Sequence, residues 1–280
     1  MTVRWTTTQC SRLRELEADE VELDRVFTEP KERDRQYQQL EKRLVETAKA
    51  RLREYRDRYR RPILCRLESR LVEMLVDQGF VQVSTPTLMA GGLLKRMGID
   101  ECHPLFTQVY WVGEGKCLRP MLAPHLYFIL KDLLRLWERP IRLFEVGSCF
   151  RKESQGSQHA SEFTMLNIVE MGLALEERQS RLEGLTDEVM AAAGIGDYRL
   201  ETAGSEVYGE TIDVLGGRDD LELGSAALGP HPLDAAWRLH ETWIGVGFGL
   251  ERLLMAAGGR SGLGRLGRSI SYLDGISLSL

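Results

Sequence analysis

The sequence contains no apolar segment long enough to cross a bilayer, and its five cysteines include no CxxC pair. A membrane-spanning helix needs about 20 consecutive, mostly apolar residues, and structural zinc sites usually take closely spaced cysteines. The first ten residues contain no apolar signal segment either. These absences argue against a membrane protein, a secreted protein and a zinc-ribbon protein. We therefore expect reduced thiols in a chain that resides in the cytoplasm.

Two common nucleotide-binding signatures are also missing. The chain has no P-loop, and Gly247 and Gly249 form only part of a dinucleotide-binding fingerprint, because the third glycine is absent and Arg252 stands where a small residue is needed. No internal repeat or low-complexity tract is present. Any nucleotide site in this chain must therefore be built from other elements.

The charge is distributed unevenly along the 280 residues. The net charge is −5. Residues 1–70 carry 18 basic and 14 acidic side chains, a net of +4, whereas the remainder has a net of −9. The basic excess is densest from Lys49 to Arg70. A local basic face can bind nucleic acid although the whole chain is acidic. On this feature alone, a solvated and salt-bridged helix face is the simpler interpretation.

Hydrophobic periodicity predicts a helical appendage, residues 1–60, followed by a core, residues 61–280. We expect two polar helices in the appendage, over 8–27 and 31–58, separated by Pro30. Helical patterns in the core cover 63–75, 122–137, 175–193 and 250–257. Strand patterns cover 80–86, 106–112, 141–149, 163–170, 211–215, 221–227 and 243–249. The glycine-rich stretch 258–267 is expected to be a mobile loop. Several strands are joined directly as hairpins. We therefore predict an α+β fold with a mainly antiparallel sheet flanked by helices.

Two arginines in this pattern are suited to binding phosphate. Arg151 and Glu153 alternate at the end of a strand, so both side chains point to one face, and an arginine fork matches a phosphate group. Gly247 and Gly249 permit close approach of a ligand to the backbone, and Arg252 follows in the next helical turn. A cross-strand salt bridge and a tightly packed glycine strand are the structural alternatives. Glu222 and Ser225 are oxygen donors suited to Mg²⁺, although the surrounding residues also form an ordinary strand pattern.

The order of these segments resembles motifs one, two and three of the class II aminoacyl-tRNA synthetases: a helix and a strand ending at Pro86, then FRKE at 150–153, then GFGLER at 247–252. More specifically, nearly the whole of residues 4–280 is similar to the pyrrolysyl-tRNA synthetase family. The segments that carry this resemblance are LRPMLAP at 118–124, CFRKES at 149–154, EFTMLN at 162–167, WIGVGFGLERLL at 243–254 and SISYLDG at 269–275.

The resemblance implies a role for each matching position. The residues implied to bind ATP are Arg151, Glu153, His159, Ala160, Phe163, Glu222, Leu223, Ser225 and Arg252, with adenine stacked on Phe163. Glu222 and Ser225 are also implied to bind Mg²⁺, and Arg151 and Arg252 to be catalytic. The residues implied to contact the amino acid are Ala123, Leu126, Tyr127, Leu130, Asn167, Val169, Tyr208, Ala227, Trp243 and Gly245. Asn167 would read the side-chain amide of the substrate, and Tyr208 would cap it from a mobile hairpin. For the apolar wall residues, plain core packing is the alternative.

The same resemblance implies a class II synthetase fold and ATP-dependent ligation of pyrrolysine to its tRNA through an aminoacyl-adenylate. It also implies a homodimer built around the segment ending at Pro86. The chain is too short for the fused RNA-binding domain of many family members, so a separate N-terminal-domain protein is a candidate partner. With the family in view, the basic face is expected to contact tRNA. The alternatives are a class II synthetase of another specificity, such as a phenylalanyl-like one, and a catalytically inactive, RNA-binding paralogue.

Overall fold

The computed structural model describes residues 2–152, 160–217, 220–258 and 262–280. The chain divides into two compact units, which we describe separately. Unit 1 comprises Met1–Pro62 together with Ser269–Leu280, and unit 2 comprises Ile63–Arg268. The C-terminal segment therefore belongs to the same unit as the N-terminal residues. Among the described residues, no helix has the length and apolar character that a bilayer span requires.

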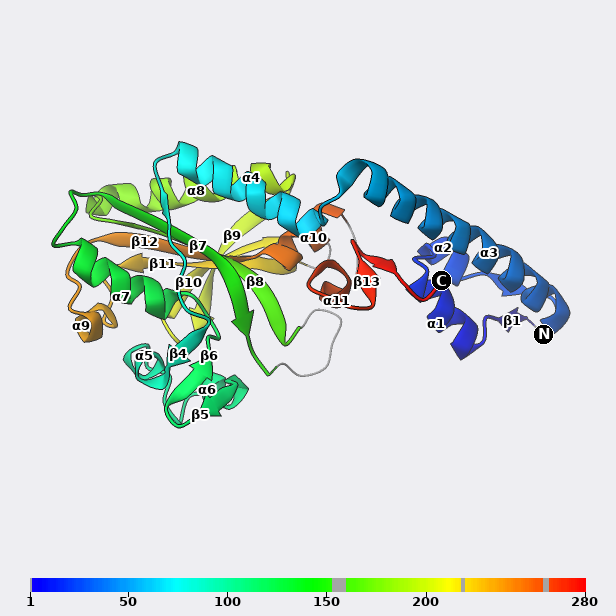
Figure 1. Cartoon of the computed structure of the whole chain (residues 1–280), viewed down its shortest axis with the longest axis horizontal. Helices are drawn as coiled ribbons and strands as arrows, with labels where there is room; N and C mark the ends of the chain where they lie inside the picture. The colour runs from blue at the N-terminus through cyan, green and yellow to red at the C-terminus, as the bar shows by residue number, and fades with distance from the viewer. Residues whose placement is uncertain (1, 153–159, 218–219, 259–261) are drawn as a thin grey trace. The chain divides into compact units, whose positions relative to one another are not determined.

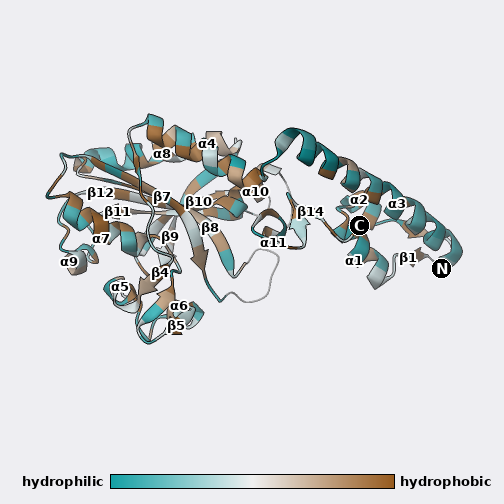
Figure 2. Ribbon diagram, in the orientation of Figure 1, coloured by the Kyte–Doolittle hydropathy of each residue, from teal (hydrophilic) through white to brown (hydrophobic). Residues whose placement is uncertain are grey.

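Unit 1 is a small helical unit with two short two-stranded ribbons. Its helices are α1 (Thr7–Glu15), α2 (Glu20–Leu23), α3 (Pro30–Glu54) and the π-helical turn η1 (Tyr55–Tyr59). Its strands are β1 (Val3–Arg4), β2 (Val26–Phe27), β13 (Tyr272–Leu273) and β14 (Ile276–Ser277). A small core forms around Trp5 and Phe27, whose ring centroids lie 4.4 Å apart. Figure 2 shows α3 coloured mainly as hydrophilic, in agreement with its thin apolar stripe.

The prediction of one helix over 8–27 is wrong. Helix α1 ends at Glu15, and Glu17 adopts a left-handed conformation with φ 61°. Asp19 then caps the short helix α2 by accepting a hydrogen bond from the Glu22 backbone N–H at 2.7 Å. Val26 and Phe27 leave the helical pattern to pair with β1. Apolar burial against Trp5 and a local capping group together outweigh the helical propensity of this polar stretch.

A seven-stranded sheet forms the centre of unit 2 (Figure 1). Its spatial order is β3-β7-β8-β12-β11-β10-β9, and all neighbouring pairs are antiparallel except β3 with β7. The strands are β3 (Val81–Gln82), β7 (Ile141–Phe150), β8 (Glu162–Met171), β9 (Tyr198–Ser205), β10 (Gly209–Gly216), β11 (Leu221–Gly229) and β12 (Trp243–Gly249). The predicted α+β architecture with a mainly antiparallel sheet is confirmed.

Helices cover one face of this sheet and leave room for a cavity on the other. Helices α4 (Ile63–Asp77), α8 (Arg178–Ala193) and α10 (Leu250–Gly258) pack on the first face around a core that includes Leu71, Phe144 and Phe248. Helix α7 (Ala123–Leu133) lies against the opposite face (Figure 1). The remaining helical segments are α5 (Gly91–Arg96), α6 (Pro104–Gln108), η2 (Leu175–Glu177), α9 (Asp234–Trp237) and α11 (Leu263–Leu266).

Three local predictions in unit 2 need correction. The expected strand over 106–112 is instead helix α6, whose Pro104 occupies the first turn, followed by β5 (Trp111–Gly113). Strand β5 belongs to a separate three-stranded sheet with β6 (Lys116–Leu118) and β4 (Leu88–Ala90). The expected strand over 80–86 pairs only at Val81–Gln82. Helix α11 forms within the glycine-rich stretch because Leu263 and Leu266 are both buried.

Candidate active site

One cavity of about 330 Å³ lies on the α7 side of the sheet, and all of the predicted site residues that the structure describes line it. They come from α7, β8, β11 and β12, from the turn between β9 and β10, from both ends of the β7–β8 connection and from the start of α10. Glu153 and His159 lie outside the described residues. The positions that the sequence singled out separately are therefore brought to one place.

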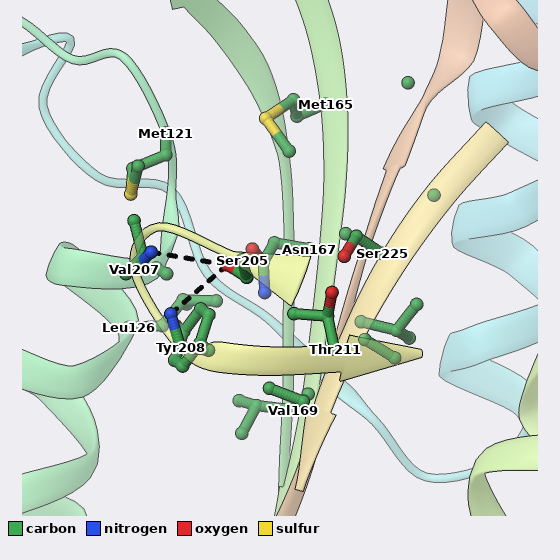
Figure 3. Close-up of a pocket in the computed structure, with 18 of the residues that line it drawn as sticks. Met121, Leu126, Met165, Asn167, Val169, Ser205, Val207, Tyr208, Thr211 and Ser225 are labelled. Carbon is green, nitrogen blue, oxygen red and sulfur yellow. Dashed lines mark hydrogen bonds between the residues drawn. The ribbon is translucent and has the colours of Figure 1, made fainter. Parts of the chain in front are cut away.

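Strict alternation along β8 divides its side chains between cavity and core. Leu166 and Ile168 are fully buried in the core beneath α8 and α10, whereas Met165, Asn167 and Val169 face the cavity. Figure 3 shows Asn167 and Val169 near Thr211 and Ser225, which come from neighbouring strands of the same sheet. The Asn167 amide is thus a polar group between the apolar side chains of Met165 and Val169 on the cavity wall.

Arg151 and Arg252 line the same cavity from different elements. The Nε of Arg151 donates to the Pro120 carbonyl at 3.0 Å, and its guanidinium carbon lies 5.4 Å from the Phe163 ring centroid. Arg252 donates from Nη1 to the Glu222 carbonyl at 3.0 Å and lies 3.6 Å from the Glu222 carboxylate. Two cations and one aromatic face therefore border this end of the cavity, an arrangement suited to a phosphorylated aromatic ligand.

A β-bulge places Glu222 and Ser225 on the same side of the sheet. Residues three apart on a regular strand point to opposite faces. The β10–β11 register shifts between Val214 and Leu215, so Leu223 becomes an extra residue and the alternation is reset. Accordingly, both Glu222 and Ser225 line the cavity, while Leu223 and Ala226 contribute to the cavity lining and also belong to the core of the other face.

The Ser225 hydroxyl has a defined orientation. It donates to Oδ1 of Asp213 at 2.7 Å, and the Thr211 hydroxyl donates to the same oxygen at 3.1 Å. The hydroxyl lone pairs therefore remain available on the cavity side. With the Glu222 carboxylate, they provide hard oxygen donors of the kind that Mg²⁺ prefers. Within the described part of the chain, no cluster of three or more histidine, cysteine or acidic side chains could bind a metal on its own. These residues fit a cation that takes its other ligands from phosphate and water.

The other end of the cavity is aromatic and deeply buried. The Tyr127 and Trp237 rings are stacked with centroids 5.4 Å apart, and the Trp243 ring meets Tyr127 edge-on at 5.8 Å. Burial raises the pKa of the Tyr127 hydroxyl, so it stays neutral. A Cβ atom at Gly245 would lie 3.2 Å from Cζ3 of Trp243, so glycine preserves space beside this wall. This end can accept a long apolar side chain.

The turn between β9 and β10 carries Tyr208 to the cavity. The Ser205 hydroxyl oxygen accepts hydrogen bonds from the backbone N–H groups of Val207 at 3.3 Å and Tyr208 at 3.2 Å, as Figure 3 shows. The Tyr208 ring lies 6.3 Å from the Trp243 ring. Burial raises the pKa of Tyr208 to about 12, so its hydroxyl can donate a hydrogen bond at neutral pH.

A buried polar network behind the cavity went unrecognised in the sequence. Arg119 and Glu145, both almost completely buried, form an ion pair at 2.7 Å. Arg119 also donates to the Ser148 carbonyl at 2.8 Å, and the Thr85 hydroxyl donates to Glu145 at 2.8 Å. Arg119 precedes Pro120, whose carbonyl accepts from Arg151. The network therefore fixes the backbone that orients a site arginine.

Other lining residues were also missed. They are Leu105, Met121, Met165, Met171, Ser205, Val207, Thr211, Gly224, Ala226, Val246, Glu251 and Leu263. Gly247 and Gly249, which were expected to permit close approach of a ligand, line the cavity too. The alternation of β8 could have identified Met165 and Met171, since they share a face with Asn167. For Leu105 and Leu263, which lie in or beside short helices far from the motifs, the sequence contains no comparable signal.

Comparison with known proteins gives a consistent result. The family model described as the phenylalanyl tRNA synthetase beta chain CLM domain matches residues 60–220. Curated relatives include a threonine--tRNA ligase of Finegoldia magna, 25% identical over 177 residues, which cover 59% of this chain and 26% of the relative. A lysine--tRNA ligase of Magnetococcus marinus is 27% identical over 144 residues, which cover 51% of this chain and 26% of the relative. The chain thus spans about a quarter of the length of these curated relatives.

Solved structures match over nearly the full length. A crystal structure of pyrrolysyl-tRNA synthetase from Desulfitobacterium hafniense is 49% identical, with a TM-score of 0.93, and the match covers 99% of both chains. A second structure from the same organism is 48% identical, with a TM-score of 0.90, and the match covers 99% of this chain and 96% of that one.

Proposed function

The chain belongs to the pyrrolysyl-tRNA synthetase family, and we propose that it ligates pyrrolysine to its cognate tRNA at the expense of ATP. One observation supports this most strongly: among the described residues, two arginines, a pair of oxygen donors, a set of apolar side chains and the Asn167 amide all line the same cavity. Pyrrolysine is a lysine acylated by a ring, so its recognition needs length, apolar walls and one amide-reading group. With phenylalanine as the substrate, the Asn167 side-chain amide would have no hydrogen-bond partner on the bound side chain.

The nucleotide would occupy the end of the cavity bordered by Arg151, Phe163 and Arg252. Phe163 offers a face for adenine, with Ala160 and Leu223 beside it, and the two guanidinium groups would hold the phosphates. The family resemblance adds Glu153 and His159 to this set. Glu222 and Ser225 would hold Mg²⁺, which neutralises phosphate charge when bound.

The first step needs no general base, because the substrate carboxylate is already ionised at neutral pH. A carboxylate oxygen attacks the α-phosphorus, the bond from that phosphorus to the β-phosphate bridging oxygen breaks, and pyrophosphate leaves. Arg151 and Arg252 would be catalytic by stabilising the charge that develops on the phosphoryl oxygens, and the cavity would supply alignment. The product is the aminoacyl-adenylate.

In the second step a terminal ribose hydroxyl of tRNA attacks the aminoacyl carbonyl and displaces AMP. We assign tRNA contact to the basic residues from Lys49 to Arg70, of which those up to Arg61 belong to unit 1. Part of this face is ion-paired, since Arg51 pairs with Glu17 and Arg58 with Glu54. The Arg58–Glu54 pair is exposed, and such pairs are worth little and can exchange for phosphate contacts. Residues 1–60 would then be the tRNA-contacting segment and 61–280 the catalytic core.

The assembly is also part of the proposal. Val76, Val81 and Leu88, which flank or belong to the segment ending at Pro86, are large apolar side chains that are 42–50% exposed. They suit a homodimer interface built on this segment. A separate N-terminal-domain protein would supply further tRNA contacts, and a tRNA ligase of this kind would act in the cytoplasm.

ATP–pyrophosphate exchange tests the proposal. Exchange should depend on pyrrolysine or an Nε-acylated lysine, and phenylalanine, threonine, histidine and unmodified lysine should not support it. Exchange with phenylalanine instead would assign a different specificity. No exchange with any amino acid, together with retained tRNA binding, would indicate the inactive RNA-binding paralogue.

A further inference from the structure

The turn that carries Tyr208 is attached to the rest of unit 2 by two histidines from two separate loops. Residues 205–209 connect β9 to β10, and Gly209 has a φ of 70°, which suits glycine. Hydrogen bonds to the Ser205 hydroxyl shape the turn itself. Contacts to other parts of the chain must decide where it lies relative to the cavity.

His231 makes the first attachment. Its Nε2 lies 2.9 Å from the Tyr208 carbonyl oxygen, and its ring meets the Tyr208 ring edge-on with centroids 5.4 Å apart. The backbone N–H of His231 donates to Oδ2 of Asp234 at 2.7 Å, and the same oxygen accepts from the Trp243 indole at 2.8 Å. His231 is thus fixed to a residue of the pocket wall.

His103 makes the second attachment, although it lies 103 residues before Glu206 in the sequence. Its Nε2 lies 3.2 Å from the Glu206 carbonyl oxygen. His103 is also the N-cap of α6, since its Nδ1 accepts from the Leu105 backbone N–H at 3.1 Å, and Leu105 lines the cavity. Two separate loops therefore reach carbonyl groups of one turn, those of Glu206 and Tyr208.

Both histidines require the same tautomer. A carbonyl oxygen can only accept, so each Nε2 must carry the hydrogen. At His231 the Leu233 N–H points at Nδ1 at 3.2 Å, so that nitrogen must accept, as it does in His103. Each ring therefore donates from Nε2 and accepts at Nδ1, so both nitrogens are used. Two imidazoles that only filled space would not together contact four backbone groups in this way.

We propose that His103 and His231 are positioning residues that hold the 205–209 turn over the amino-acid pocket, and so set the affinity for the amino acid. This inference rests on the proposed function for the identity of the bound molecule. Tyr208 contacts the substrate in that proposal, whereas the histidines act through its backbone. Their loss should therefore raise KM for the amino acid and leave KM for ATP, which binds at the other end, unchanged.

The experiment compares His103→Ala, His231→Ala, the double variant and His231→Gln with wild type. Removing one hydrogen bond should raise KM for the Nε-acylated lysine about 3- to 10-fold, and the double variant should show a larger rise than either single one. Gln can place an amide N–H near the position of Nε2, so His231→Gln should recover most of the affinity. His240→Ala is the matched control, because His240 is exposed and outside the cavity.

Hydrogen–deuterium exchange of the ligand-free protein gives a readout that needs no substrate. Backbone amides of residues 205–210 should exchange faster in the alanine variants, and those of β8 should not. If no amino acid supports pyrophosphate exchange, the proposed function fails, yet this measurement still tests the attachment. Unchanged amide exchange in the turn, or equal rises of KM for amino acid and ATP, would overturn the inference. Thermal unfolding of the Gln variant separates these results from a folding defect.

Discussion

The guanidinium carbon of Arg151 lies 5.4 Å from the Phe163 ring centroid, on the two sides of the β7–β8 hairpin. Arginine and aromatic ring thus form one corner of the cavity, although twelve residues separate them in the chain. The corner is anchored because Arg151 Nε donates to the Pro120 carbonyl. Both side chains line the cavity.

Replacement of Arg151 by alanine should reduce ATP–pyrophosphate exchange by about 100-fold or more, because a preorganised charge at the phosphoryl group is lost. Thermal unfolding should change little. Arg199→Ala is the control, since Arg199 is a half-exposed arginine that pairs with Asp220 and lies outside the cavity. Wild-type exchange in Arg151→Ala would remove this residue from the mechanism.

Asn167→Ala should weaken use of an amide-bearing substrate by roughly 1–3 kcal/mol in kcat/KM, because one hydrogen bond in a buried site is lost. Among the described residues, no hydrogen bond of the Asn167 side chain competes with the substrate. The comparison is made with an Nε-alkyl lysine that lacks the carbonyl. An equal loss for both substrates would show that Asn167 is only structural.

Gly245→Ala should discriminate against large acyl rings. Its Cβ would lie 3.2 Å from Trp243, so the pocket narrows at its apolar wall. We expect KM to rise more for a ring-bearing substrate than for Nε-acetyl-lysine. Gly184→Ala serves as the control for a glycine substitution: nothing lies within 4 Å of its Cβ position in α8, and we expect about 0.5–1 kcal/mol of added stability.

Glu145→Gln should destabilise unit 2 by roughly 3–5 kcal/mol, because it leaves the Arg119 charge buried without its counter-ion. Urea unfolding measures the change. Glu201→Gln removes an exposed partner of Arg199 and should shift stability by less than about 0.5 kcal/mol. Equal urea midpoints for Glu145→Gln and Glu201→Gln would contradict the prediction that the buried ion pair contributes more to stability than the exposed one.

Alkylation should distinguish the cysteines. Burial raises the pKa of Cys149 to about 12 and that of Cys117 to about 11. A raised pKa means less thiolate at pH 8, so both thiols should resist iodoacetamide. Cys102 is exposed and should react first. Peptide mapping by mass spectrometry, before and after unfolding in guanidinium, provides the measurement, and rapid labelling of native Cys149 would contradict it.

The strands that the sequence predicted well are those with strong alternation and clear turns. β7, β8, β11 and β12 form at their predicted positions because one face is buried and glycine or polar residues mark their ends. β9 was missed, since none of its side chains is buried and its apolar residues are few. It forms because its backbone pairs with β10 over eight residues.

The site residues could be named from motifs, but the contacts that hold them could not. The bulge at Leu223 depends on the pairing of β10 with β11, and no single strand sequence encodes it. Likewise, the ion pair of Arg119 with Glu145 and the attachment of His103 to the turn join positions 26 and 103 residues apart. Such interactions follow from topology, which a single sequence does not reveal.

The C-terminal segment has a practical consequence for dissecting this enzyme. Ser277 donates to Glu15 at 2.9 Å, and Arg12 donates to the Ser279 carbonyl at 2.7 Å, so the last residues complete the unit formed by the first. A gene fragment that stops near residue 62 would encode an incomplete module with missing partners. Researchers who wish to study RNA binding in isolation should splice 269–280 onto the fragment through a short linker, and should keep affinity tags away from Leu280.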